Sequence, residues 1–166
     1  MPRNRSTSAI AGQPGQRRLP PLLRRAWYSL NQAFRRRIAH LGITPDQFSI
    51  LRWLHEGDPK GLTQREIADL MASDPNTITS ILNRMEQSGL ISRNMHESDR
   101  RAHRIRIKAS GRRVFVQGKD IAKRLQVEVL SVLPKSKMDE FLEDLEVVAN
   151  ACQHALGEKD FTTRDQ

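Results

Sequence analysis

Apolar residues recur every three or four positions along most of the chain, the period of helices with one buried face. The first such run begins near residue 20 and ends at Gly42. Its apolar positions fall on one side of a predicted helix of about twenty residues: Leu23, Trp27, Leu30, Phe34, Ile38 and Leu41.

Three shorter helices are predicted next, each preceded by a residue that can cap it. Thr44 with Gln47 and Thr63 with Glu66 have the spacing of capping boxes, and Asp74 precedes Pro75 at a first helical position. The predicted helices end at Gly57, shortly after Leu70, and at Gly89. Their apolar faces are Phe48, Leu51 and Leu54, then Ile67 and Leu70, then Ile78, Ile81, Leu82 and Met85.

After Gly89 the apolar period becomes two, which predicts a two-stranded ribbon. Its strands are residues 90–93 and 104–107, and residues 94–103 form a long polar tip. Two further helices follow, from near Gly111 to about Val132 and from a Ser136 cap to Gly157. Their candidate core residues are Val114, Ile121, Leu125 and Val129, and then Phe141, Leu145, Val148 and Cys152.

Two short helices followed by a ribbon indicate a winged helix-turn-helix. In this fold one helix enters the DNA major groove and presents short polar side chains to base edges. Residues 74–88 fit this requirement, because apolar residues lie behind and polar ones in front; the helix start itself also favours a phosphate. The alternative is an ordinary amphipathic helix with a polar face, but the ribbon that follows favours a DNA-reading helix. The candidate DNA-binding residues are Pro75, Asn76, Thr77, Thr79, Ser80, Asn83 and Arg84.

The ribbon tip carries Asp99-Arg100-Arg101. Arginines on a protruding hairpin are well placed to enter a narrow minor groove. We expect Arg100 and Arg101 to contact DNA and Asp99 to orient an arginine. The alternative is a solvated charged loop.

Charge divides the 166-residue chain further. It carries 28 Lys+Arg against 19 Asp+Glu, a net charge of +9, and nine of the arginines precede the first acid, Asp46. Residues 1–18 lack a helical period and are predicted to be a disordered basic arm. That arm could be a solubilising tail, a source of phosphate contacts or an organelle transit peptide. Residues 84–113 hold nine basic residues and three acids, which suits a polyanion partner.

The stretch from Leu62 to Gly111 resembles the multiple-antibiotic-resistance regulator (MarR) family of bacterial transcription factors. Leu62–Ala68 is similar to the family's first motif helix, and Thr77-Ile78-Thr79 with Asn83–Glu86 is similar to its recognition helix. Ser88–Arg93, Asp99–Arg101 and Ile105–Gly111 resemble the wing. Two positions depart from the family: Ser80 stands where many relatives have arginine. Lys108 stands where a capping threonine is common, so Ser110 is expected to cap instead or the helix to begin later.

The resemblance covers about residues 20–157 and implies a mainly helical protein with a small β-wing. It implies dimerisation helices at 19–41 and 111–157 around a DNA-binding part at 45–108, with a frayed tail at 158–166. It further implies a cytoplasmic, ligand-responsive homodimeric repressor on a near-palindromic operator, with a small aromatic or anionic effector. Trp27, Tyr28 and Trp53 could line the effector cleft, or Trp27 and Trp53 could lie in the core or interface.

Other classes of protein fit less well. No apolar run reaches the ~18 residues of a membrane helix, and no secretory signal is evident. The single Cys152 excludes an intrachain disulfide framework, and we expect it to pack as a small hydrophobe, with an interchain or redox role as the alternative. The histidines show no metal-ligand spacing, so no metal or cofactor is expected. No enzyme motif is found. A non-specific nucleoid-type DNA-binding protein remains the alternative function.

Overall fold

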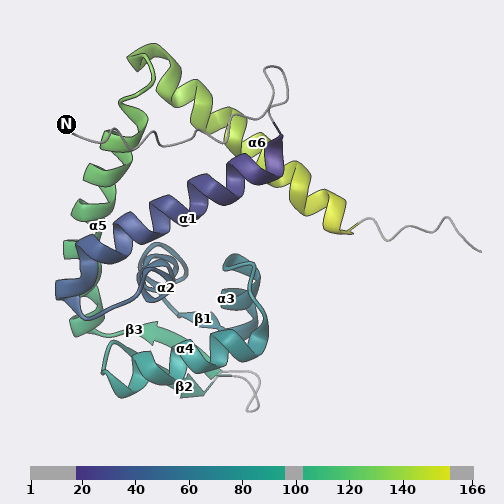
Figure 1. The fold of residues 1–166 in the computed structure, drawn as a ribbon. Helices are drawn as coiled ribbons and strands as arrows, with labels where there is room; N and C mark the ends of the chain where they lie inside the picture. The colour runs from purple at the N-terminus through teal and green to yellow at the C-terminus, as the bar shows by residue number, and fades with distance from the viewer. Residues whose placement is uncertain (1–17, 96–102, 158–166) are drawn as a thin grey trace, which may run out of the picture. The chain divides into compact units, whose positions relative to one another are not determined.

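The computed structural model describes residues 18–95 and 103–157, and these fall into two compact units that divide after Ile121. The first contains all the predicted DNA-binding elements (Figure 1). Its elements are α1 (Leu19–Ile38), η1 (Ala39–Leu41), α2 (Pro45–Glu56), β1 (Leu62–Thr63), α3 (Gln64–Leu70), α4 (Pro75–Gln87), β2 (Ile91–Met95), β3 (His103–Ile107) and the first half of α5 (Ala109–Leu130).

The predicted caps form where the sequence places them. Thr44 and Gln47 make a complete capping box at α2, and Thr63 and Glu66 make another at α3. Each box satisfies backbone amides that a helix start leaves without partners. Gly42, at φ 68°, ends the short 3-10 turn after α1 in the left-handed conformation that suits glycine.

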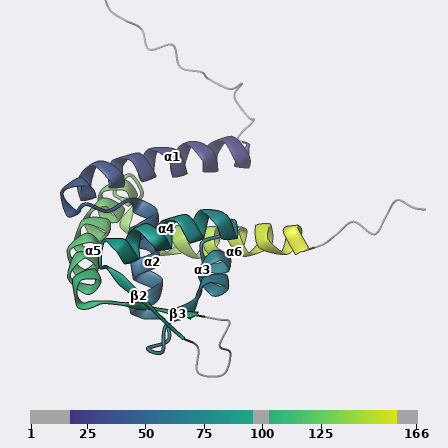
Figure 2. The same cartoon turned by 90° about the horizontal axis from the view of Figure 1, so that it is seen from below.

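The sheet has three strands rather than the predicted two, in the order β1-β3-β2. β2 and β3 form the expected antiparallel ribbon, with Ile91 opposite Ile107 and Arg93 opposite Ile105 (Figure 2). The prediction missed β1, which pairs Leu62 with Ile105, although the helix that follows begins at Gln64, directly after its predicted Thr63 cap. A two-residue strand has no period of its own, because it depends on a partner about forty residues away.

Aromatic side chains form the centre of the first unit. Phe48 of α2 meets Phe34 edge-on, with ring centroids 4.9 Å apart, and stacks on Phe115 of α5 at 5.6 Å. Gly118, one helical turn from Phe115, provides the space for the Phe48 ring. The apolar period had suggested Val114 as core instead; the structure leaves Val114 half-buried and buries Phe115 completely.

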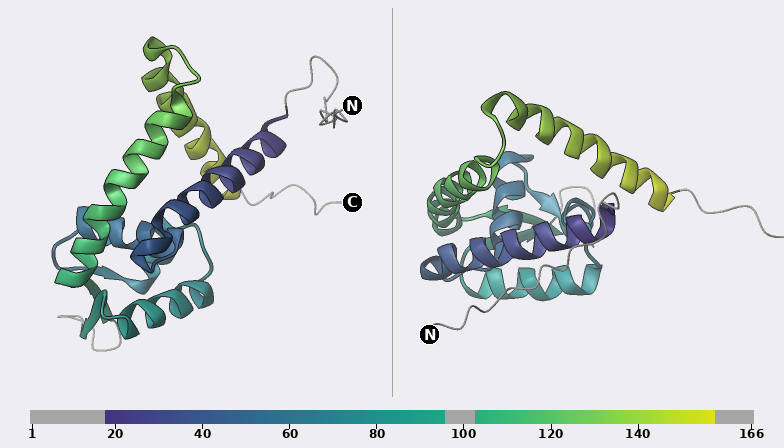
Figure 3. Two further views of the ribbon diagram at one scale, coloured as in Figure 1. Left: turned by 60° about the vertical axis from the view of Figure 1, so that its left-hand side comes forward. Right: turned by 45° about the horizontal axis from the view of Figure 1, so that its top comes forward.

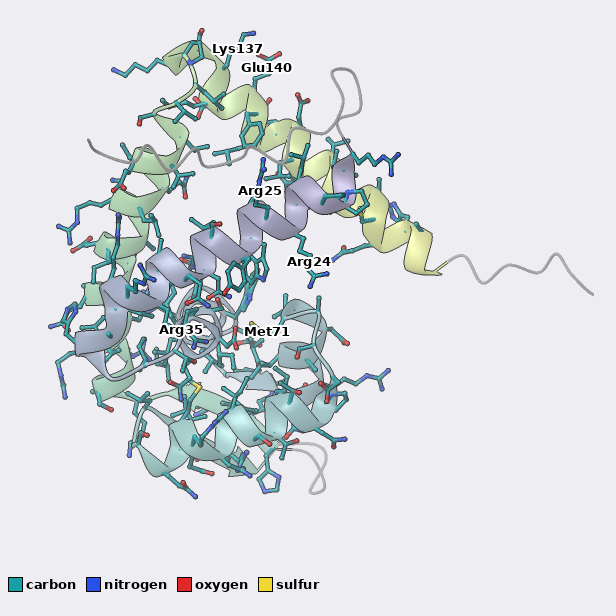
Figure 4. The ribbon with its side chains drawn as sticks, in the orientation of Figure 1. Arg24, Arg25, Arg35, Met71, Lys137 and Glu140 are labelled. Atoms are coloured by element: carbon teal, nitrogen blue, oxygen red, sulfur yellow. The ribbon has the colours of Figure 1, made fainter. Side chains whose placement is uncertain are left out.

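The apolar face of α1 is covered only near the end of the helix. Ile38 is fully buried, whereas Leu23, Leu30 and Trp27 are 37%, 39% and 63% exposed. Trp27 is therefore not a core residue of the single chain. Arg24 and Arg25 also extend outward from this helix (Figure 4). The apolar period therefore identified the correct face of α1, but most of that face is exposed in the described part of a single chain.

The second unit consists of the end of α5, the short turn η2 (Lys135–Lys137) and α6 (Met138–Gly157) (Figure 3). Ser136 lies within η2 and does not cap α6. Leu125 is buried, but Val129, Phe141 and Leu145 are 46%, 43% and 37% exposed.

Cys152 is also exposed, so the prediction that it is packed is wrong for the single chain. Among the described helices, none combines the length and apolar character needed to cross a membrane.

Candidate nucleic-acid interface

α3 and α4 form a helix-turn-helix whose turn is held by backbone hydrogen bonds. The amides of Met71, Ala72 and Ser73 donate to carbonyls of α3, and Ala72 takes a positive φ of 46° to reverse the chain. Gln64, at the start of α3, donates from Nε2 to Thr79 Oγ1 of α4 over 2.6 Å. This bond fixes the first turn of α4 against α3.

Asp74 caps the start of α4. Its Oδ1 accepts from the amides of Asn76 and Thr77 at 3.0 and 2.9 Å, and its Oδ2 accepts from the Thr77 hydroxyl. The hydrogen bonds from the Thr77 side chain and amide lower the pKa of Asp74. The expectation that this helix start favours a phosphate therefore needs correction, because a carboxylate already holds two of its amides.

The outer face of α4 is polar and the inner face is apolar, as predicted. Ile78, Ile81, Leu82 and Met85 are buried. Thr79 is half-buried, and its hydroxyl donates to the Pro75 carbonyl at 2.7 Å while it accepts from Gln64. Its one hydroxyl hydrogen is thus already used. The other predicted site residues of α4 are exposed: Pro75, Asn76, Thr77, Ser80, Asn83 and Arg84.

One side chain of the wing, Arg93 on β2, binds two residues of α4. Its Nη2 donates to Asn83 Oδ1 at 2.7 Å, and its Nη1 donates to Glu86 Oε2 at 2.8 Å. Glu86 and Arg93 form an ion pair with side chains 39% and 24% exposed. The first wing strand is thereby tied to the second half of α4.

The two arginines of β3 hold the loop before β1. Arg104 Nη1 donates to the Gly61 carbonyl at 2.7 Å and lies 3.8 Å from Asp58 Oδ2. Arg106 Nε donates to the Lys60 carbonyl at 2.8 Å. The excess of basic residues in 84–113 predicts that these arginines face a polyanion, but their hydrogen bonds give them a structural role as well.

The exit from the wing into α5 is tightly packed. The Lys108 amide donates to the Leu90 carbonyl at 2.9 Å, and the Ser110 hydroxyl donates to the Gly89 carbonyl at 2.6 Å. The helix begins at Ala109, close to the predicted start near Gly111, so it does not begin later and Ser110, within its first turn, does not cap it. Ser110 instead joins α5 to the turn that follows α4.

Arg100, Arg101 and Asp99 lie outside the described residues, so their predicted roles in the wing tip stay predictions. Sequence reasoning also missed Gln64 and Arg93 as residues that organise the surface. Gln64 directly follows the Thr63 cap, but nothing in its spacing indicates Thr79. Arg93 lies seven residues after Glu86 across a turn, so neither helical nor strand periodicity pairs them. Within the described part of the chain, no cluster of His, Cys, Asp and Glu could hold a metal ion.

Comparison with known proteins shows the family to which the chain belongs. Residues 43–103 match the model of the MarR family. An uncharacterized helix-turn-helix transcriptional regulator, YsmB of Bacillus subtilis strain 168, is 31% identical over 131 residues, covering 78% of this chain and 85% of the relative.

Solved structures agree with this relationship. The transcriptional repressor CouR bound to a 23-mer DNA duplex is 29% identical with a TM-score of 0.72, covering 80% of this chain and 92% of CouR. A structure of CouR from Rhodococcus jostii RHA1 bound to p-coumaroyl-CoA shares the fold, with 23% identity, a TM-score of 0.69 and coverage of 87% and 93%. The chain belongs to the MarR family of DNA-binding, winged helix-turn-helix transcriptional regulators.

Proposed function

We propose that this regulator reads a near-palindromic operator as a homodimer and represses transcription by covering a promoter. The observation that carries the proposal is the exposed polar face of α4 beside the wing. Its short side chains suit the major groove, which admits one helix. Asn76, Thr77, Ser80 and Asn83 would approach base edges and Arg84 a phosphate. Thr79 would contribute its methyl group, since its hydroxyl hydrogen is in use.

The wing tip completes the proposed interface. Arg100 and Arg101 would enter the minor groove beside the site read by α4, with Asp99 orienting one of them. Changing Arg101 to Ala should weaken binding by about 1–3 kcal/mol if that arginine makes a specific contact. An unchanged affinity in a titration at fixed salt would remove Arg101 from the interface. The basic arm, residues 1–18, would add phosphate contacts, so its deletion should lower the salt dependence without changing the preferred sequence.

Selection of bound duplexes from a random pool, at near-physiological salt, tests sequence reading. A homodimer with two copies of α4 should enrich a palindrome whose half-sites lie about one helical turn apart. Enrichment of nothing beyond a general A·T bias would favour the non-specific, nucleoid-type alternative. Repression would be tested by placing the enriched palindrome within a promoter and measuring transcription in vitro with and without the protein.

The proposed dimer rests on apolar side chains that one chain leaves exposed. They lie on α1 and α6, within the proposed dimerisation segments 19–41 and 111–157, and include Leu23, Trp27, Phe141 and Leu145. Sedimentation of the Leu23→Glu variant should show a shift toward monomer. Leu70→Glu is a matched control, because Leu70 is a leucine on α3 with 42% exposure against 37% for Leu23. Equal effects of the two substitutions would contradict the assignment of α1 to the interface.

An effector is proposed as a small aromatic or anionic molecule that releases the duplex. A cavity of about 280 Å³ at the wing base would suit a small anion, because Arg106 and Arg112 line it beside His55 and outnumber its one acid, Asp58. p-Coumarate is the probe that suits a cavity of this size, and p-coumaroyl-CoA, with which CouR has been seen, tests whether a larger anion acts elsewhere. Release of the DNA duplex from the protein on addition of p-coumarate would support the proposal, and retention with both compounds would count against this ligand class. The site of action would be the chromosome in the cytoplasm.

A further inference from the structure

We propose that Arg93 is a positioning residue for sequence reading: it fixes the Asn83 amide so that Asn83 presents its NH₂ group to DNA. This inference rests on the proposed function, in which Asn83 lies on the DNA-facing side of α4. It adds which group of the Asn83 amide faces DNA, and that Arg93 sets the orientation of this amide.

The hydrogen-bond chemistry determines the orientation of the amide. A guanidinium group can only donate, so the Asn83 atom 2.7 Å from Arg93 Nη2 must be the carbonyl oxygen. The amide of Asn83 is thereby held with its oxygen toward the wing strand. The Nδ2 group is left to donate. It suits acceptors such as guanine N7 and O6, thymine O4 or a phosphate oxygen better than the two-sided contact that asparagine makes with adenine.

Arg93 is itself held in place by Glu86. The carboxylate of Glu86 lies 2.8 Å from Nη1, and it neutralises the guanidinium charge locally. Asn83 and Glu86 are three residues apart and therefore neighbours on the same side of α4. Arg93 thus spans nearly one turn of the helix from a strand of the wing. A guanidinium paired in this way is a poor phosphate ligand, because its charge is offset and two of its donors are occupied.

The arrangement also joins the two DNA-reading elements. Arg93 lies opposite Ile105 in the β2–β3 ribbon, and Ile105 is buried. Because Arg93 is fixed in the ribbon by this pairing, a shift of the ribbon relative to α4 would move its side chain and break the bonds to Asn83 and Glu86. Fixing a side chain before binding reduces the conformational entropy that binding must overcome. Arg93 supplies this order to Asn83.

Binding assays on Arg93→Lys test the proposal, with the full chain and two probes: the duplex enriched by selection and a shuffled duplex of equal composition. Lysine keeps the positive charge but cannot bind both partners in the same fork geometry. We expect discrimination between the two duplexes to fall roughly tenfold. A repeated selection should lose preference at the same base pair that Asn83→Ala affects. In the Asn83→Ala background, Arg93→Lys should change discrimination by less than about twofold, since contacting residues are not additive.

Arg104→Lys provides a matched control. Arg104 is also a half-buried wing arginine bound to a carbonyl and an acid, but its partners are Gly61 and Asp58 rather than residues of α4. This variant should keep the wild-type preference at the Asn83 base pair. Circular dichroism and thermal melting confirm that each variant is folded at the assay temperature.

Two results would overturn the assignment. One is an equal loss of affinity for both duplexes, together with a slope of log affinity against log salt concentration that is smaller by about 0.9. That result would make Arg93 a direct phosphate ligand. The other is an unchanged base preference in a folded Arg93→Lys protein. If instead the wild-type protein enriches no sequence, the proposed function itself fails, and that outcome is seen before any variant is made.

Discussion

Gly111 occupies a place in α5 where no side chain fits. A β-carbon added there would lie 2.3 Å from the Leu90 carbonyl oxygen, 3.0 Å from Ile107 Cγ1 and 3.1 Å from Leu51 Cδ2. Ordinary contacts of this kind begin near 3.4 Å. Because the nearest atom belongs to the backbone, the helix start or the wing base must move. The Gly111→Ala variant therefore tests how closely α5 is packed against the wing.

The size of the effect follows from three contributions. Alanine is favoured over glycine in a helix by about 1 kcal/mol. Overpacking costs about 1–3 kcal/mol. Moving the helix start also weakens the bonds from the Lys108 amide to Leu90 and from Ser110 Oγ to Gly89, each worth about 0.5–1.5 kcal/mol. We expect a net destabilisation of about 1–5 kcal/mol, so steric cost exceeds helix propensity.

Urea unfolding at one fixed protein concentration measures this difference. The concentration must be fixed because association contributes to the apparent stability of an oligomer. Gln117→Ala, on an exposed face of the same helix, should change stability by no more than about 0.5 kcal/mol. Gly118→Ala should also destabilise the protein, because its β-carbon would lie 2.7 Å from two atoms of the buried Phe48 ring. If Gly111→Ala stabilises the protein as an ordinary helical substitution does, the close packing inferred here is wrong.

Three further predictions concern the stability and DNA binding of the helix-turn-helix. Ala72→Gly should stabilise the protein by up to about 1.5 kcal/mol in urea unfolding, because relief of the positive φ outweighs glycine's larger unfolded-state entropy; a lower midpoint would contradict this. Hydrogen bonds from the Thr63 amide and hydroxyl lower the pKa of Glu66 below its ordinary 4.5. Glu66 therefore contributes stability above about pH 4.5 that is lost as the pH falls through its folded pKa, and the stability difference between wild type and Glu66→Gln should shrink over that range in thermal melts. Arg84→Ala should weaken binding to the enriched and the shuffled duplex equally, and should reduce the slope of log affinity against log salt concentration by about 0.9. A loss of affinity that depends on sequence would instead assign Arg84 to a base contact.

Features encoded by neighbouring residues could be predicted from the sequence. The caps at Thr44, Thr63 and Asp74 depend on groups within three residues, and all three form as expected. The alternation in 104–107 likewise predicts a strand with Ile105 and Ile107 inward, and both are buried. Such signals need no knowledge of distant partners.

Features that depend on distant partners were missed or misjudged. β1 exists only because Leu62 and Thr63 pair with β3, some forty residues later. The roles of Gln64 and Arg93 depend on how α3, α4 and the wing are folded against one another, which no local pattern states. For α1, the apolar period predicted the correct face of the helix but not what packs against it, and Trp27 is largely exposed in the single chain.

The polar side chains of α4 differ in how much freedom they have left to lose on binding. Thr77 and Thr79 have their hydroxyl hydrogens committed to Asp74 and Pro75, and Asn83 is held by Arg93. Arg84 is long and exposed, so ordering it costs more conformational entropy. A fixed group suits a base edge, where a small error in position breaks the hydrogen bond. A flexible cation suits a phosphate, where the attraction depends less on angle. We therefore propose that the fixed side chains of α4, Asn83 among them, select the sequence, and that Arg84 contributes affinity without selecting it.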